Sequence, residues 1–241
     1  MSRKISLWSG PRNVSTALMY SFRQRADTKV FDEPLYGPYL ERVAADTHPA
    51  GYEVLEHLPT NPDHIIDHVL LADGDTPVRF YKNMAHHLLD LDRRFLGELT
   101  NLLLIRDPKE VLQTLTVQIS EPTLRDTGLI EQVEILDYML ARDEEPVVLD
   151  AKQLLLDPEG VLRRACDKLG LDFDPAMLSW PAGPKPEDGA WAPHWYHNVH
   201  KSIGFAPYRP KAEPFPERLQ PLLDEARPLY ERLYEYAIRT A

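Results

Sequence analysis

Short apolar runs recur along the chain, and each ends in a turn of polar, charged or proline residues. Five of these runs have the length and composition of strands that are buried on both faces of a parallel sheet. Longer segments lie between them, in which apolar residues return every three or four positions, the spacing of amphipathic helices. The predicted strands are residues 5–8, 29–31, 78–81, 102–105 and 146–149.

The segments between these strands predict helices. They lie from residue 15 onward and at 35–43, 64–71, 110–118, 124–141 and 158–169, with shorter helical stretches within 87–95 and near 153. The C-terminal residues 216–239 predict a further helix, which Pro228 interrupts. Because strands alternate with helices, we predict the α/β class, a three-layer α/β/α fold with a central parallel sheet.

Composition indicates one globular domain over residues 1–241, since 43% of the residues are hydrophobic. No apolar run approaches the ~20 residues that span a bilayer, and no secretory segment is recognised at the N-terminus. We therefore predict a cytoplasmic protein. The single cysteine, Cys166, can form no internal disulfide and is expected to be a small buried core residue.

The formal net charge of -11 narrows the set of partners. Binding to a nucleic acid or to an anionic membrane needs a basic face, and neither partner is expected here. A homodimer remains compatible with the sequence.

The turn after the first predicted strand, residues 9–16, has the features of an anion site. It opens a helix, so its backbone N–H groups and the helix dipole converge on one point. Arg12 adds a positive charge, and Ser15 and Thr16 add hydroxyl groups. The alternative is that Ser15 only caps the helix. The turn lacks the lysine of a Walker A motif, so no magnesium site is implied.

A second charged turn follows the fourth predicted strand. It begins at Arg106, and Thr114 lies eight residues farther on. Ligands of parallel α/β sheets bind at the carboxyl ends of the strands, so both turns are expected at one edge of the sheet.

Together these turns resemble the nucleotide-binding motifs of the sulfotransferases that use 3′-phosphoadenosine 5′-phosphosulfate (PAPS). The first resembles the 5′-phosphosulfate loop of that family, with Arg12 as the cation that stabilises the bridging oxygen. The second resembles the 3′-phosphate motif, with Thr114 supplying the hydroxyl. Many members have Gly where this chain has Val14, and Asn13 can adopt a left-handed conformation that Val14 cannot.

Further matches extend over most of the chain. Residues 147–159 and Leu169-Gly170-Leu171 resemble a strand and helix of the family, and residues 201–205 resemble its glycine-containing loop that closes over the nucleotide. In that loop Lys201 is expected to face the 3′-phosphate. A proline-rich surface loop is the alternative explanation for this segment.

The resemblance implies a P-loop NTPase-like sulfotransferase fold. It also implies transfer of a sulfuryl group from PAPS to a hydroxyl or amine of a small-molecule acceptor, without a metal. The residues expected to bind this co-substrate are Gly10, Pro11, Arg12, Asn13, Val14, Ser15, Thr16, Arg106, Thr114, Lys201 and Gly204.

Four residues are expected to take part in catalysis. Arg12 and Lys82 are the cations expected around the leaving phosphate. Glu33, after the second strand, is the favoured base because some members of the family place a catalytic Glu there. His87 is its rival, with His86 beside it. The alternatives are a solvated strand-end lysine, a carboxylate at a helix start and a surface histidine.

Other interpretations stay open. A small-molecule kinase and a non-catalytic nucleotide-binding protein of the same fold compete with the sulfotransferase. His194, His197 and His200, like His64 and His68, invite a metal site, but no Cys or carboxylate nearby in sequence completes one. Residues 48–75 and 175–216 are expected to shape the acceptor pocket, and the aromatic residues there either line it or pack in the core: Trp191, Trp195 and Tyr196.

Overall fold

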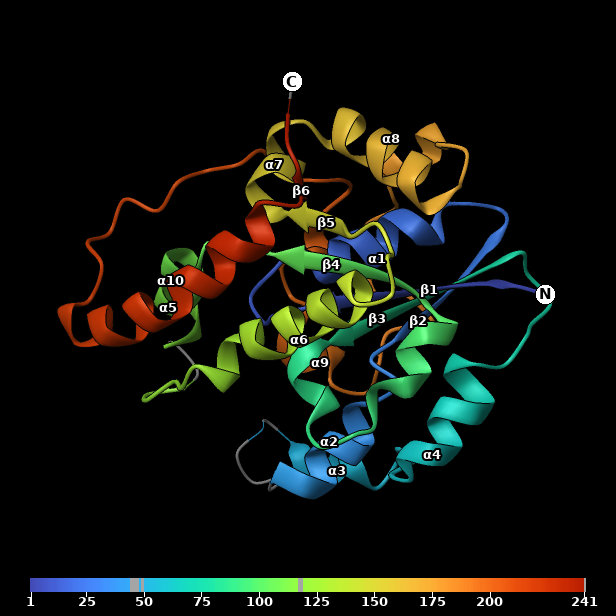
Figure 1. Cartoon of the computed structure of the whole chain (residues 1–241), viewed down its shortest axis with the longest axis horizontal. Helices are drawn as coiled ribbons and strands as arrows, with labels where there is room; N and C mark the ends of the chain where they lie inside the picture. Colours follow the sequence, from blue (N-terminus) through green and yellow to red (C-terminus); the bar gives the residue numbers. More distant parts are fainter. Residues whose placement is uncertain (44–47, 49, 117–118, 241) are drawn as a thin grey trace.

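The five apolar runs predicted as strands all lie in one parallel sheet (Figure 1). The computed structural model describes residues 1–43, 48, 50–116 and 119–240. The sheet has six strands in the order β2-β3-β1-β4-β5-β6. Their bounds are β1 Arg3–Ser9, β2 Thr28–Asp32, β3 Val78–Met84, β4 Thr100–Ile105, β5 Val147–Asp150 and β6 Ala237–Ile238.

Alternate side chains of the strands enter two separate cores. On β1, Ile5 and Leu7 pack with α1 and α8, whereas Trp8 packs on the other face with α6 and α10. Figure 1 shows α8 and α6 on opposite sides of the sheet. The sheet is therefore the middle layer of three, and the predicted fold class is confirmed.

Most helices lie in the predicted segments, whereas Gly51–Leu55 and Ala192–Trp195 form short helices that were not predicted. Most cover a face of the sheet, and α2, α3 and α4 gather beyond it at the bottom of Figure 1. Their bounds are α1 Ser15–Arg23, α2 Tyr36–Val43, α3 Gly51–Leu55, α4 Pro62–Ile65, α5 Pro108–Leu115, α6 Leu129–Leu140, α7 Ala151–Leu156, α8 Pro158–Leu169, α9 Ala192–Trp195 and α10 Gln220–Tyr234. Residues 117–118, the end of one predicted helix, lie outside the described residues.

The C-terminal segment differs from its prediction in two ways. Helix α10 continues through Pro228 without interruption. Proline has no N–H group, so the carbonyl of Asp224 lacks its usual hydrogen-bond partner in the helix. Asp224 and Pro228 are both exposed, so water can hydrate that carbonyl. The chain then ends in β6, a strand of two residues that is too short to show a periodic pattern.

The predicted core role of Cys166 is confirmed, because its side chain is fully buried between α8 and the sheet. Burial raises the pKa of its thiol to about 11, which keeps it protonated and unreactive at neutral pH. No described helix has the length and apolar character required to cross a bilayer.

Candidate active site

A cavity of about 530 Å³ opens at the carboxyl ends of the central strands. This size can hold a nucleotide-sized molecule. Its walls come from the loop after β1, the ends of β2 and β3, helix α5 and the segment from Trp191 to Ala206. Of the predicted acceptor segment 48–75, His48 contributes to the described lining.

The loop after β1 turns sharply at Arg12, whose φ of 55° is left-handed. The side chain of Asn13 fixes the next peptide, because its Oδ1 accepts a hydrogen bond from the Val14 N–H at 2.8 Å. Its Nδ2 donates to the Leu104 carbonyl at 3.1 Å. Asn13 could have adopted a left-handed conformation, but Arg12 takes that conformation instead.

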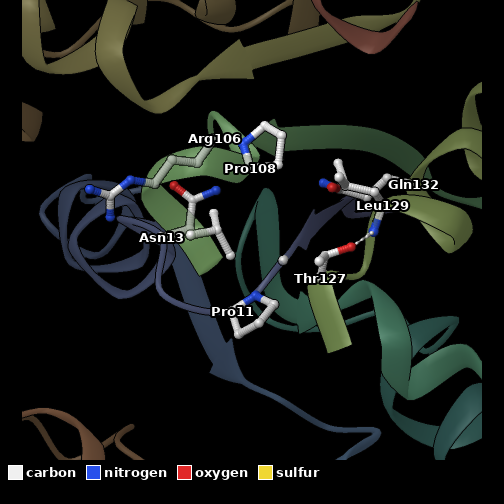
Figure 2. Close-up of a pocket in the computed structure, with 9 residues that line it drawn as sticks. Pro11, Asn13, Arg106, Pro108, Thr127, Leu129 and Gln132 are labelled. Carbon is white, nitrogen blue, oxygen red and sulfur yellow. Dashed lines mark hydrogen bonds between the residues drawn. The ribbon is translucent and has the colours of Figure 1, made fainter. Parts of the chain in front are cut away.

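Close packing supports this loop from behind. A Cβ atom on Gly10 would lie 2.3 Å from the Thr127 carbonyl oxygen, so the close approach of the two backbones requires glycine. Figure 2 shows Pro11 and Asn13 facing Thr127, Leu129 and Gln132 across a void of about 10 Å³. A void of that size has room for at most about one water molecule, so the loop rests on a nearly solid base.

The amino terminus of α1 faces the cavity without a side-chain cap. Val14 occupies the N-cap position, and no side chain accepts a hydrogen bond from the first turn. Ser15 is the first helical residue, so the interpretation of Ser15 as the cap is wrong. The amide groups of the first turn have no partner within the helix. Together with the helix dipole they can bind an anion, and Ser15, Thr16 and Ala17 all line the cavity.

Two arginines meet beside this helix end. Arg106 donates from Nη1 to the Arg12 carbonyl at 2.7 Å, and its Nε and Nη2 donate to Glu110 at 3.0 and 2.9 Å. Arg106 thus holds the left-handed turn and shares its charge with Glu110. Burial, and then the charge of Arg106, lower the pKa of Arg12, although an arginine remains cationic at neutral pH. Arg12 has no ion pair among the described residues.

A buried ion cluster occupies the ends of β2 and β3. Asp32 and Lys82 are paired in the sheet register, so their side chains leave the sheet on the same face. Lys82 Nζ donates to Asp32 Oδ1 at 2.9 Å, to Glu33 Oε1 and to the Tyr196 hydroxyl. Trp191 Nε1 also donates to that hydroxyl, at 3.2 Å. The cluster therefore fastens the segment around Tyr196 to the sheet.

Burial dominates the electrostatics of this cluster. It raises the pKa of Glu33, and the attraction of Lys82 does not cancel this effect. Burial alone would lower the pKa of Lys82, but Asp32 and Glu33 outweigh it, so the pKa of Lys82 is raised well above its usual value. Lys82 is 1% exposed, which rules out a solvated strand-end lysine. All three of its N–H donors are used, so it has none left for the predicted contact with a leaving phosphate.

His87 lies close to this cluster but is not bonded to it. Its Nε2 is 4.0 Å from Glu33 Oε2, and its ring stacks on Tyr39 with a centroid distance of 4.4 Å. Burial, and then the neighbouring His86, lower the pKa of His87 well below its usual value. Burial also lowers the pKa of His86, to about 4. Both imidazoles are buried and neutral at pH 7, so neither is a surface histidine.

Most residues expected in the site line this one cavity. They are Pro11, Arg12, Asn13, Val14, Ser15, Thr16, Glu33, Lys82, His87, Arg106, Thr114 and Gly204. Gly10 lies behind the loop, and Lys201 is exposed and does not line the cavity. Of the four cations expected at this end of the sheet, Arg12, Lys82 and Arg106 line the cavity and Lys201 does not. Lys82 and Arg106 are paired with carboxylates, and Lys201 lies elsewhere.

Sequence reasoning missed one cation close to the cavity, Lys211. Lys211 Nζ donates to the Thr114 hydroxyl, although 97 residues separate them. No local pattern signals that contact, because it depends on the path of an irregular proline-rich segment.

Trp191 and Tyr196 are buried and also line the cavity, so both interpretations of these aromatic residues hold. The described residues contain no group of three or more His, Cys, Asp or Glu that could hold a metal.

The loop after β1, the cationic turn after β4 and the buried carboxylate of Glu33 thus open into one cavity at the carboxyl edge of a parallel sheet. A family model described as a sulfotransferase domain matches residues 3–237. The chain belongs to the sulfotransferase domain family.

Two relatives from Arabidopsis thaliana, named branched-chain-amino-acid aminotransferase-like proteins 1 and 2, are 38% and 37% identical to this chain over 230 residues. Each match covers 95% of this chain and 41% of the relative. The chain therefore spans less than half the length of these relatives, whose names describe longer proteins.

Solved structures of sulfotransferases share the fold. The sulfotransferase domain of the Synechococcus PCC 7002 olefin synthase is 16% identical, covers 93% of this chain and 95% of its own, and has a TM-score of 0.57. The sulfotransferase domain from the curacin biosynthetic pathway is 16% identical, with coverages of 94% and 98% and a TM-score of 0.54. A sulfotransferase from Alicyclobacillus acidocaldarius is 12% identical, with coverages of 100% and 98% and a TM-score of 0.54.

Proposed function

We propose that this chain is a PAPS-dependent sulfotransferase that transfers a sulfuryl group to a hydroxyl or amine of a small-molecule acceptor. The observation that carries the proposal is the shared cavity. The uncapped amino terminus of α1 and the buried Glu33 open into it, together with Arg12, which forms no ion pair with any residue that the structure describes. Family membership supports the sulfuryl transfer, and the anion-binding end supports a phosphosulfate donor.

Arg12 and the amide groups of Ser15 and Thr16 hold the phosphosulfate in this mechanism. Negative charge develops on the bridging oxygen as the bond between sulfur and that oxygen breaks. Donors that are already oriented stabilise this charge without reorganising during the reaction. The nearly solid base under the loop keeps them oriented. The leaving group is adenosine 3′,5′-bisphosphate.

Glu33 accepts the proton of the acceptor as the new bond forms between the acceptor atom and sulfur. Its raised pKa makes it a stronger base than an exposed carboxylate. Lys82 binds Oε1 of Glu33, which leaves Oε2 for the acceptor. Lys82 therefore positions the base in this mechanism, and His87 packs beside it as a neutral ring.

Calorimetric titration tests the donor. Adenosine 3′,5′-bisphosphate is expected to bind more tightly than ATP, whereas preference for ATP would overturn the proposal in favour of a kinase. Sulfate transfer from PAPS to a panel of hydroxyl and amine acceptors then tests turnover. Arg12→Ala is expected to lower kcat by about 10²-fold to 10³-fold, the usual effect of removing one such donor. Unchanged turnover in a folded Arg12→Ala variant would remove Arg12 from the mechanism.

A further inference from the structure

The end of the cavity around Glu33 carries an excess of negative charge. Lys82 lies between the carboxylates of Asp32 and Glu33, so this buried cluster has one more carboxylate than cation. Its N–H donors are taken up by these carboxylates and by the Tyr196 hydroxyl. A ligand that carries a carboxylate or phosphate group therefore finds no free donor on this lysine.

Carboxylates behind this end of the cavity act in the same direction. Tyr39 stacks on His87, which lines the cavity. Burial, and then the charges of Asp126 and Glu131, raise the pKa of Tyr39 to about 12, with Arg125 opposing them and Glu33 adding to them. Among these charged neighbours, the carboxylates outweigh the cation. The wall that Tyr39 supports therefore lies in a negative potential.

Two neutral imidazoles belong to this wall. His86 and His87 line the cavity, and burial lowers the pKa of both rings, so they add no positive charge at neutral pH. The Nδ1 atom of each ring is buried and has no hydrogen-bond partner among the described residues. A neutral imidazole can accept a hydrogen bond from a ligand N–H or O–H group, but it cannot form an ion pair with an anion.

Aromatic rings supply the rest of the lining at this end. The Tyr196 ring lies 4.9 Å from Lys82 Nζ, and the Tyr36 ring packs against Trp191 with a centroid distance of 4.8 Å. Trp195 also lines the cavity and is half-buried. In the described part of the chain it forms no aromatic or cation–π pair. A tryptophan ring attracts a cation that lies within about 6 Å of its face.

We infer that the acceptor is a hydroxyl compound that carries a positively charged ammonium group, and that Trp195 selects this group. The inference rests on the proposed function and narrows its acceptor to one chemical class. In the reaction, the acceptor hydroxyl oxygen forms a bond to sulfur, and its proton passes to Glu33. The bond between sulfur and the bridging oxygen breaks, and adenosine 3′,5′-bisphosphate leaves. A cation beside Glu33 also favours the ionised form of this base.

Matched compounds that differ in charge test the inference. Choline and 3,3-dimethylbutan-1-ol share one shape, and choline is the cation. Tyramine, 4-ethylphenol and 4-hydroxyphenylacetate form a second series of cation, neutral molecule and anion. Each compound is titrated calorimetrically into the protein, with and without saturating adenosine 3′,5′-bisphosphate. The cation is expected to bind about tenfold more tightly than its neutral partner.

The inference stands if the cation of either series is preferred and neither series prefers its neutral or anionic member. Any other result overturns it, including the absence of binding by both cations. Failure of the proposed donor is a separate result, because the wild-type protein would then not bind adenosine 3′,5′-bisphosphate. The charge preference would still be measured without that nucleotide.

Substitution of Trp195 tests its part in the selection. In Trp195→Leu the preference for the cation over its neutral partner is expected to fall roughly threefold to thirtyfold, as for a lost cation–π interaction. Trp195→Phe should retain part of the preference. Unchanged affinity for adenosine 3′,5′-bisphosphate would show that both variants are folded.

His194→Leu is the matched control, because His194 is exposed on the same short helix, α9, and does not line the cavity. This variant should keep the wild-type ratio of the two affinities. The assignment of Trp195 is overturned if Trp195→Leu keeps that ratio, if it weakens the cation and the neutral molecule equally, or if His194→Leu loses the ratio as well.

Discussion

Glu33 shows what a single residue contributes to this site. Its φ of 43° is left-handed, a conformation that costs a glutamate free energy and that persists only where surrounding contacts enforce it. The Glu33 N–H donates to the Lys82 carbonyl at 2.7 Å, and the Lys82 ammonium binds its carboxylate. Backbone and side chain are therefore held by the same neighbour, which aims the carboxylate into the cavity.

Replacing Glu33 tests its role as the base. Glu33→Gln is expected to lower kcat by about 10²-fold or more, because the amide cannot accept the proton. The Kd for adenosine 3′,5′-bisphosphate should be unchanged. A proton acceptor must be ionised, and burial raises the pKa of Glu33. The acid limb of kcat/KM is therefore expected above the ordinary carboxyl value of 4.5, with activity lost as the pH falls through the raised pKa.

His87→Gln is the comparison for this prediction. The variant should keep the acid limb and lose less activity than Glu33→Gln, because a neutral imidazole with a strongly lowered pKa is a weak base. Stopped or continuous assays across pH 4–9 would show both effects. If His87→Gln were inactive while Glu33→Gln remained active, His87 and not Glu33 would be the base.

At the scale of elements, strands β2 and β3 act as one unit. Their register pairs Asp32 with Lys82, and Lys82 also binds Glu33 just beyond the strand. Two carboxylates and one ammonium group are thus buried together at the end of the sheet. Removing one member of a buried charge cluster lowers the free energy of unfolding more than removing all its charges does. The charge that remains is buried without water and without a partner.

Lys82→Met is therefore expected to lower the free energy of unfolding by about 3 to 5 kcal/mol. Urea unfolding followed by far-UV circular dichroism measures this change. The triple variant Lys82→Met, Asp32→Asn, Glu33→Gln removes the charges together and should recover much of the loss. A loss below about 1 kcal/mol in the single variant would show that water still reaches the two carboxylates.

The elements differ in how far their sequences predict them. The five buried strands and helix α8 are found from apolar periodicity, because each must cover a core face along its whole length. The strand β6 has two residues and exists only because β5 has a free edge beside it. Pro228 predicts a break that does not occur, because the penalty of proline depends on whether the freed carbonyl reaches water.

For the whole molecule, net charge and local charge are separate quantities. The chain carries -11 overall, yet Arg12, Arg106 and Lys211 gather around one end of the cavity. The loop after β1, the turn between β4 and α5, and the irregular segment that carries Lys211 supply them from distant parts of the sequence. Cations gathered at a cavity produce a positive electrostatic potential there, so a protein with a negative net charge can still bind an anion in that cavity.

A ligand that joins these three parts should stabilise the folded state as a whole. Adenosine 3′,5′-bisphosphate at 100 times its Kd is expected to add about 2.7 kcal/mol to the free energy of unfolding. For a chain of this size this corresponds to a rise in Tm of about 5–10 °C. Thermal unfolding with equal concentrations of the bisphosphate, 5′-AMP and ATP measures it. A larger rise with ATP than with the bisphosphate would contradict the proposed donor.

The sequence by itself determined the layered sheet and the two turns at its carboxyl edge. Both are local properties, since strand burial follows from short-range periodicity and a helix start after a strand creates an anion site wherever it occurs. Arg12, Glu33 and Thr114 could therefore be named from the residues and their resemblance to a family. The left-handed residue of the first turn, Arg12, was not predicted as such.

Only the tertiary structure decided which charges remain available. Lys82 is neutralised by two carboxylates, Arg106 is occupied by Glu110 and the Arg12 carbonyl, and Lys211 comes to Thr114 across 97 residues. Pairing between side chains depends on register and on the path of an irregular segment. Neither is written in the spacing of residues along the chain, because both follow from how the separate elements pack.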